Sequence, residues 1–208
     1  MLFFPPAALT ADDMWEKTEE DLENDIVVFT RSVEGSSIKA YQGRTTVEAT
    51  LDALVSLMSD AEAFPEWMHN VKHAGTIALI NDTERIVYVA QGTPWPVRDR
   101  DLVLYSKLEM DPDTKQVTIY IEARPDAYPE QEGYLRIREM ESMWQFTPME
   151  DGMVSVVYET YVDPGGNIPA PVVNVHTLDT PLNSLLGLRR MIKEPRYRDA
   201  VMDVLHHP

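Results

Sequence analysis

One long apolar helix near the C-terminus, in a chain otherwise rich in strand patterns, constrains the fold most. The stretch 161–192 ends a strand, turns within 163–166 and continues after Pro169 with apolar residues at helical spacing. Proline suits a first helical turn because its φ is already helical and its missing N–H has no intrahelical partner there. Pro181 falls inside the apolar pattern, so we expect a kink or a short break at 179–180.

Most of the remaining chain has the patterns of strands and turns. A short helix is expected over the acidic stretch 11–25, an amphipathic helix over 47–60 and a polar connector over 61–75. Strands are predicted at 26–33, 37–47, 76–80, 85–92, 101–110, 116–124, 132–148 and 153–163. This order indicates a long antiparallel meander. Many strands and one long helix favour an α+β fold in which a curved sheet closes around that helix.

The length of 208 residues is enough for one substantial core, so we expect a single domain over 1–208. Its parts would be an N-terminal extension or helix at 1–25, a curved sheet with an inserted helix at 26–163, and a helical region at 168–206.

The net charge of −17 weighs against a nucleic-acid partner, because such binding depends on Lys and Arg neutralising phosphates. The chain has no cysteine, which excludes disulfides and thiolate metal sites. No run of about 18 apolar residues is present to span a bilayer. The opening residues make a poor secretory signal, so we expect a cytoplasmic protein, or a periplasmic one if a signal peptide was removed.

Several separated pieces of the sequence resemble one family. They are Trp67 in 65–68, the Arg-Asp-Leu-Val run 100–103, the spaced prolines and Gly-Tyr-x-Arg of 124–136, Trp-Gln-Phe-x-Pro at 144–148, Asp-Pro-Gly-Gly at 163–166, Ile168-Pro169 and Asn174. In this order they resemble the START (steroidogenic acute regulatory protein-related lipid transfer) domain in its bacterial single-domain form. The resemblance implies a helix-grip fold, in which a strongly bent antiparallel sheet wraps around the C-terminal helix and encloses a lipid-sized tunnel.

The resemblance also implies a set of tunnel-lining residues. These are Trp67, Met68, Val87, Val89, Leu104, Ser106, Trp144, Tyr158, Val172, His176, Leu182 and Leu186. START domains that bind sterol or ceramide commonly place an acidic group and a polar or basic group on two neighbouring strands. Counted from Arg100, these positions are Val87 and Ser106 here. We therefore expect a more apolar cavity, with Ser106 and His176 as its polar groups and Met143 partly filling it.

Other polar residues admit two interpretations. Arg136 and Arg138 are candidates for contacts with a lipid headgroup, or for ion pairs with glutamates on the outer face. His176 is either a ligand contact or a core histidine. The basic cluster within 189–198 would touch anionic lipid or complement the helix dipole. His69 and His73 lack the glutamate of a metalloprotease motif, so no metal is expected.

The function predicted from these features is the binding and transfer of one hydrophobic lipid-type ligand, with no bond made or broken and no cofactor. A lid is expected near Pro181 and at the loops around 94–96 and 163–166, and membrane contact is expected to be transient. An enzyme of the cyclase, aromatase or hydrolase type that uses the same cavity stays open, as does a lipid-sensing interaction module. The sequence does not set the oligomeric state.

Overall fold

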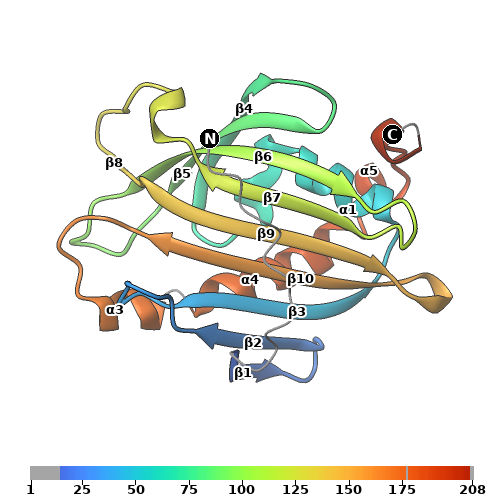
Figure 1. Cartoon of the computed structure of the whole chain (residues 1–208), viewed down its shortest axis with the longest axis horizontal. Helices are drawn as coiled ribbons and strands as arrows, with labels where there is room; N and C mark the ends of the chain where they lie inside the picture. The colour runs from blue at the N-terminus through green and yellow to red at the C-terminus, as the bar shows by residue number, and fades with distance from the viewer. Residues whose placement is uncertain (1–14, 177, 207–208) are drawn as a thin grey trace.

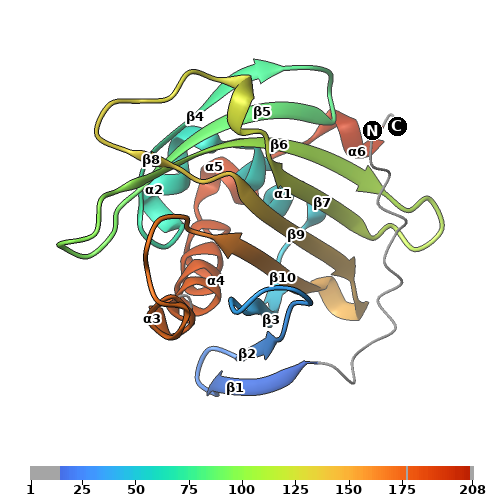
Figure 2. The same ribbon diagram turned by 60° about the vertical axis from the view of Figure 1, so that its left-hand side comes forward.

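The computed structural model of the chain describes residues 15–176 and 178–206, and at His176 the backbone only. A ten-stranded sheet curves around the C-terminal helix α4, as Figures 1 and 2 show from two sides. The α+β helix-grip prediction is therefore confirmed. The strands are β1 (Glu16–Asp21), β2 (Ile26–Arg31), β3 (Ala40–Glu48), β4 (Val71–Leu79), β5 (Glu84–Gln91), β6 (Arg100–Met110), β7 (Val117–Ala123), β8 (Leu135–Arg136), β9 (Glu139–Pro148) and β10 (Met153–Asp163). The α-helices are α1 (Leu51–Ser59), α2 (Phe64–Trp67), α3 (Ala170–His176), α4 (Asp179–Met191), α5 (Pro195–Arg198) and α6 (Asp203–His206).

The strand order is β1-β2-β3-β10-β9-β7-β6-β5-β4, so β1 and β4 are the two edges of an open sheet. The simple meander of the sequence analysis was wrong in one respect, because β3 pairs with β10 and not with β4. The segment between β3 and β4, which contains α1 and α2, crosses from one side of the sheet to the other. The short β8 adds to β6 in parallel, beyond the point where β7 ends.

The predicted N-terminal helix was also wrong where the structure describes it. Residues Glu16–Asp21 form the edge strand β1, which pairs with β2, and residues 11–14 lie outside the described residues. The Asp21 carboxylate accepts hydrogen bonds from the backbone N–H groups of Glu23 and Asn24, both at 3.1 Å. This side-chain turn reverses the chain into β2, and strand pairing overrides the weak helical pattern.

Helix α1 forms as predicted, and its start has a clear local cause. The Thr50 hydroxyl accepts a hydrogen bond from the Ala53 N–H at 3.1 Å, which caps the first turn. Leu54 and Leu57 on its inner side are fully buried. Between α1 and β4, the expected connector contains α2 and ends early, because β4 already begins at Val71.

The predicted break in the C-terminal helix is present, slightly earlier than expected. Helix α3 ends at His176 and α4 begins at Asp179. Pro181 therefore lies in the first turn of α4, where its missing N–H interrupts no helical hydrogen bond. Helix α4 packs against β2, β3 and α2, and its Leu185 and Leu188 are fully buried.

Candidate functional site

The interior between the sheet and α4 is the predicted ligand site, and its centre is packed with side chains. Six of the predicted lining residues belong to one buried apolar cluster that also contains Leu185 and Leu188 of α4. These six are Trp67, Val87, Val89, Leu104, Trp144 and Tyr158.

Aromatic rings fill the middle of this cluster. Trp144 is fully buried and stacks on Tyr158, with ring centroids 4.1 Å apart and planes inclined by 12°. Trp67 of α2 meets Trp144 edge-on at 5.9 Å. Met143, expected to fill the tunnel, instead lies opposite the exposed Tyr120 and so faces outward. Trp144, the next residue along β9, fills the interior instead.

The inner face of the β9–β10 pair changes character along its length. Near the end of β10 it carries partly buried apolar side chains, then small hydroxyls, and then the stacked aromatic pair. The pairs are Met140 with Val162, Ser142 with Thr160, and Trp144 with Tyr158.

Other apolar residues that pack against the core are only partly buried. Met68, Leu182 and Leu186 of the predicted set pack against the core without being fully buried, as does Ile121 of β7. We call this partly buried group, with Met140 and Val162, the mouth. The predicted Ser106 is half-buried on β6. Val172 on α3 is 45% exposed and lies outside the buried cluster. The side chain of His176 lies outside the described residues.

The hydroxyl pair behind the mouth was missed by the sequence analysis. Ser142 donates a hydrogen bond to the Glu159 carbonyl at 2.6 Å. The Thr160 hydroxyl is buried without a hydrogen-bond partner of good geometry among the described residues. Burial raises the pKa of the neighbouring Tyr158 to about 12, against the opposing effect of the nearby Thr160 and Ser142 hydroxyls. Alternation along β9 and β10 would have placed these groups on the face of Trp144.

Arg100 holds one of the expected lid loops. Its side chain is buried and donates hydrogen bonds to the carbonyls of Pro164 and Gly165, each at 3.2 Å. A third goes to the carbonyl of Arg98. Burial lowers the pKa of Arg100. Arg100 thus ties the loop after β10 to the start of β6.

Arg136 is not free to hold a headgroup, which corrects the sequence analysis. Its side chain is 2% exposed and forms a bidentate ion pair with Asp101, at 3.0 and 2.8 Å. The remaining donors go to the carbonyls of Pro125, Tyr128 and Pro129, at 2.6, 2.8 and 2.9 Å. All five N–H groups of the guanidinium are therefore used. The arginine clamps the loop between β7 and β8.

The other predicted basic groups are partly occupied by the fold. Arg138, between β8 and β9, is 61% exposed at its side chain and pairs with Glu130 at 2.7 Å, not with Glu139 or Glu141. Arg189 of the basic cluster donates to the Thr45 hydroxyl at 2.8 Å, and Arg196 pairs with Glu66 at 2.6 Å.

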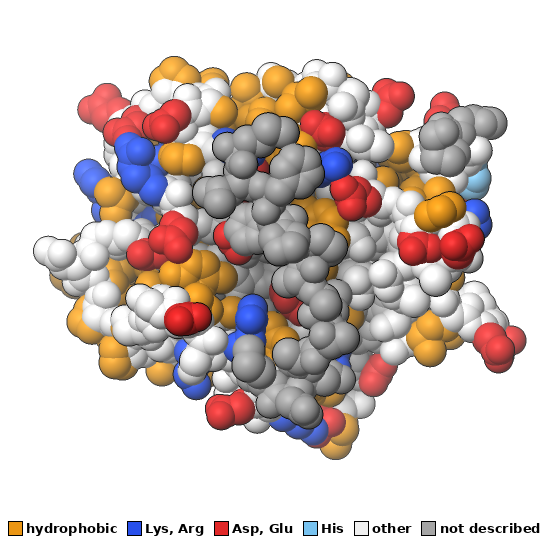
Figure 3. All heavy atoms as spheres, viewed as in Figure 1, with side chains coloured by type: hydrophobic (Ala, Val, Ile, Leu, Met, Phe, Trp, Pro, Cys, Tyr) orange, Lys and Arg blue, Asp and Glu red, His pale blue; other side chains and the backbone are white. Residues whose placement is uncertain are grey.

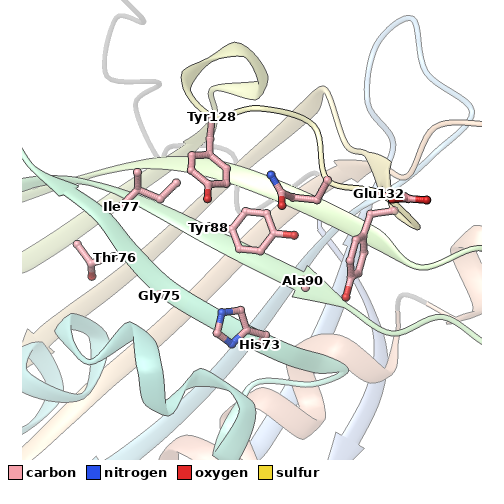
Figure 4. Close-up of a pocket in the computed structure, with 10 residues that line it drawn as sticks. His73, Gly75, Thr76, Ile77, Tyr88, Ala90, Tyr128 and Glu132 are labelled. Atoms are coloured by element: carbon pink, nitrogen blue, oxygen red, sulfur yellow. The ribbon is translucent and has the colours of Figure 1, made fainter.

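A second hollow lies on the opposite, outer face of the sheet. It is a cavity of about 640 Å³ between β4, β5 and the clamped loop. Figure 4 shows Tyr88 and Tyr128 above His73, with Glu132 at one side. Tyr88 alternates with the buried Val87 and Val89, so it faces away from the core.

Two absences among the described residues bear on function. No helix in the part of the chain that the structure describes is long and apolar enough to cross a membrane. No group of three or more His, Cys, Asp or Glu side chains in that part could hold a metal ion. On the face drawn in Figure 3, acidic side chains are spread widely among apolar ones.

Comparison with known proteins agrees with this architecture. The family model of the START domain matches residues 6–187. The uncharacterized protein PA1579 of Pseudomonas aeruginosa is 30% identical over 167 residues, which cover 80% of this chain and 82% of that protein. The STAR-related lipid transfer protein of Xanthomonas axonopodis (fragment 25–204) superposes with a TM-score of 0.81 at 32% identity, covering 88% of this chain and 100% of that fragment.

More distant structures share the fold. Human STARD10 has a TM-score of 0.78 at 18% identity, over 91% of this chain and 78% of that chain. Human StAR-related lipid transfer protein 5 has a TM-score of 0.77 at 17% identity, over 88% of each chain. The family match spans the sheet and most of α4, the two elements that form the grip. This chain belongs to the START domain family.

Proposed function

We propose that this protein binds one hydrophobic lipid-type ligand at the mouth between its sheet and α4, and transfers it without chemical change. Membership of the START family and the fold shared with lipid transfer proteins support a lipid-binding role. The observation that carries the proposal is the mouth itself. Its partly buried apolar side chains come from β7, β9, β10 and α4 and from Met68 directly after α2, and they pack against the buried core.

The predicted lining residues divide between two roles in this proposal. Met68, Leu182 and Leu186 contact the ligand chain, with Leu104, Val87 and Ser106 on the facing strands. Trp67, Trp144 and Tyr158 form the closed inner end, and Val89 stays in the core. Val172 contributes at the rim.

The polar end of the ligand is uncharged and lies against the Ser142 and Thr160 hydroxyls. A buried hydroxyl without a partner costs about 1–3 kcal/mol, so a ligand oxygen or N–H that reaches Thr160 would recover that loss. Tyr158 beside it is protonated at neutral pH, as an ordinary tyrosine is, and burial raises its pKa further to about 12. The phenol therefore serves as a hydrogen-bonding group and not as a base. A neutral alcohol, ester or amide fits these neighbours better than a carboxylate or a phosphate.

Exchange with a membrane is limited by opening of the mouth. Moving a ligand chain of about 14 methylenes from water into the protein is favourable by on the order of 11 kcal/mol, at about 0.8 kcal/mol each. Moving the same chain from water into a bilayer is favourable by nearly the same free energy, so exchange between the two is nearly thermoneutral. The loop held by Arg100 and the break before α4 are the segments that open.

Membrane contact in this proposal is made by exposed apolar groups near the mouth. Trp95, in the loop between β5 and β6, is 92% exposed, and Val175 on α3 is 65% exposed. Figures 1 and 2 both place α3 and this loop at the same end of the molecule.

The test begins with native mass spectrometry of freshly purified protein, followed by extraction and identification of the bound lipid. A protein that carries no lipid and takes none from vesicles would refute the binding proposal. The variant Thr160→Val, which keeps the shape but removes the unpaired hydroxyl, should leave stability unchanged or higher and weaken lipid binding about three- to tenfold.

The matched control is Ser155→Ala, on the opposite face of the same strand. It should leave lipid binding unchanged. If Thr160→Val binds the identified lipid as tightly as the wild type, the polar contact is wrong while the lipid-binding proposal stands.

A further inference from the structure

The cavity on the outer face of the sheet is a built structure with a rigid roof. The loop between β7 and β8 arches over β4 and β5, as Figures 1 and 2 show. Three of its backbone carbonyls, at 125, 128 and 129, accept hydrogen bonds from the buried Arg136, which Asp101 holds in turn. A fully bonded buried ion pair fixes the roof over the floor, so the hollow exists before any ligand arrives.

The walls of this cavity are aromatic. Tyr88 on the floor and Tyr128 in the roof lie with ring centroids 5.7 Å apart and planes inclined by 54°. His73 stands 6.4 Å from Tyr88 at 52°, and Tyr134 completes the lining on the loop. Inclined rings form a concave wall, whereas stacked rings would close the space. Gly75 and Ala90, which lie next to Tyr88 on β4 and β5, add no large side chain to the floor.

The lining of the cavity is acidic. Neither Lys nor Arg lines it, whereas Glu132 does. A second carboxylate, from Glu62, would lie 3.7 Å from a Cβ added at Gly75. The guanidinium behind the wall is neutralised by Asp101. The net charge of −17 adds a long-range attraction for cations.

We propose that this outer cavity binds an organic ammonium ion, with its charge against the tyrosine rings and Glu132. The ring faces of tyrosine attract a cation within about 6 Å, and a quaternary ammonium suits such a site because it is bulky and weakly hydrated. The ammonium belongs either to a free small molecule or to a lipid headgroup at a membrane surface. This site faces away from the mouth and stands independently of the proposed function.

The direct test is a titration of the purified protein with choline, followed by NMR of tyrosine ring signals and by calorimetry. The matched probe is 3,3-dimethylbutan-1-ol, which has the same shape with carbon in place of the charged nitrogen. Choline should bind with shifts confined to the cavity, and the neutral probe should bind at least about tenfold more weakly. Equal binding of the two probes, or no binding of choline, would overturn the proposal.

Substitutions of the cavity-lining residues test whether choline binds in this cavity. Tyr128→Leu in the loop and Tyr88→Leu on the floor should each weaken choline binding about tenfold, and Glu132→Gln about threefold. The control is Tyr120→Leu, because Tyr120 is 43% exposed on the outer face of β7 and outside the cavity lining. Should the floor variant fail to fold, the roof variant and Glu132→Gln still decide. Unchanged binding in both would refute the assignment.

Vesicles distinguish the two sources of the cation. Cosedimentation with phosphatidylcholine vesicles that Tyr128→Leu abolishes, and that phosphatidylglycerol vesicles do not reproduce, assigns the site to a lipid headgroup. Binding of free choline without such cosedimentation assigns it to a small molecule. Either result supports the shared chemistry, and the lack of both contradicts it.

Discussion

Gly187 allows α4 to sit directly on the backbone of α2. A Cβ added at this glycine would lie 2.2 Å from the carbonyl oxygen of Trp67, 2.9 Å from its carbonyl carbon and 3.0 Å from its Cα. In an ordinary helix interior, replacing glycine by alanine stabilises by about 1 kcal/mol, because glycine loses more backbone entropy on folding. Here the same substitution forces two backbones apart.

The substitution Gly187→Ala should therefore destabilise the protein. Overpacking of this kind typically costs about 1–3 kcal/mol, and the upper part of that range applies because the neighbour is backbone and cannot rotate away. Set against the helical gain of about 1 kcal/mol, the net loss should be about 1–2 kcal/mol. Urea unfolding should give a lower midpoint with an unchanged slope.

A second glycine provides the control. A Cβ at Gly92 would meet Cε of Lys72 at 2.6 Å, but that contact is the far end of a flexible, exposed side chain. Gly92→Ala should change stability by less than about 0.5 kcal/mol. A Gly187→Ala variant at least as stable as the wild type would show that α4 does not rest on α2 in this way.

Three further substitutions test other parts of the fold by the same unfolding assay. Arg136→Met leaves Asp101 buried and unpaired and should cost about 3–5 kcal/mol, whereas Arg138→Met, at an exposed pair, should cost less than about 1 kcal/mol; equal losses would contradict the clamp. Thr50→Ala removes the cap of α1 and should cost about 1 kcal/mol. Burial lowers the pKa of His69, so the unfolded chain binds that proton more readily and stability falls as the pH drops below about 6.5. The fall should be smaller in His69→Asn, and superimposable pH profiles would exclude this contribution.

Local patterns predicted most of the elements because their causes are local. The alternation of apolar residues along β10 fixes which face is buried, and Pro181 places the break in the helical region to within a few residues. The prediction of an N-terminal helix was wrong because β1 is stabilised by pairing with β2, and β2 lies outside the stretch 11–25 on which that prediction was based. Pairing of β3 with β10 joins residues more than 100 positions apart, so the meander was the wrong inference for the same reason.

The site was harder to predict than the fold. Strand alternation places Trp144 and Tyr158 inside, but it does not say whether they line a cavity or fill it. Their stacking, with ring centroids 4.1 Å apart, shows that they fill the space. The burial of Arg136 depends on its ion pair with Asp101, which lies 35 residues earlier and on another strand. A sequence pattern places each arginine on a face, but the burial of its charge requires the partner to be known.

The β9–β10 pair also determines the orientation of a ligand under the proposed function. A molecule that enters at Met140 and Val162 meets the hydroxyls of Ser142 and Thr160 before the ring of Trp144 stops it. Its polar end therefore lies innermost in this proposal, where the Ser142 and Thr160 hydroxyls and the unpaired indole N–H groups of Trp67 and Trp144 offer hydrogen bonds. Its apolar chain is then left among the side chains of the mouth, next to the exposed loops that would meet a bilayer. An apolar chain pushed inward instead would leave the Thr160 hydroxyl unpaired and bring the ligand's own polar group among apolar side chains. The Ser142–Thr160 hydroxyl pair thus determines both the chemistry of the ligand's inner end and the direction in which the ligand leaves.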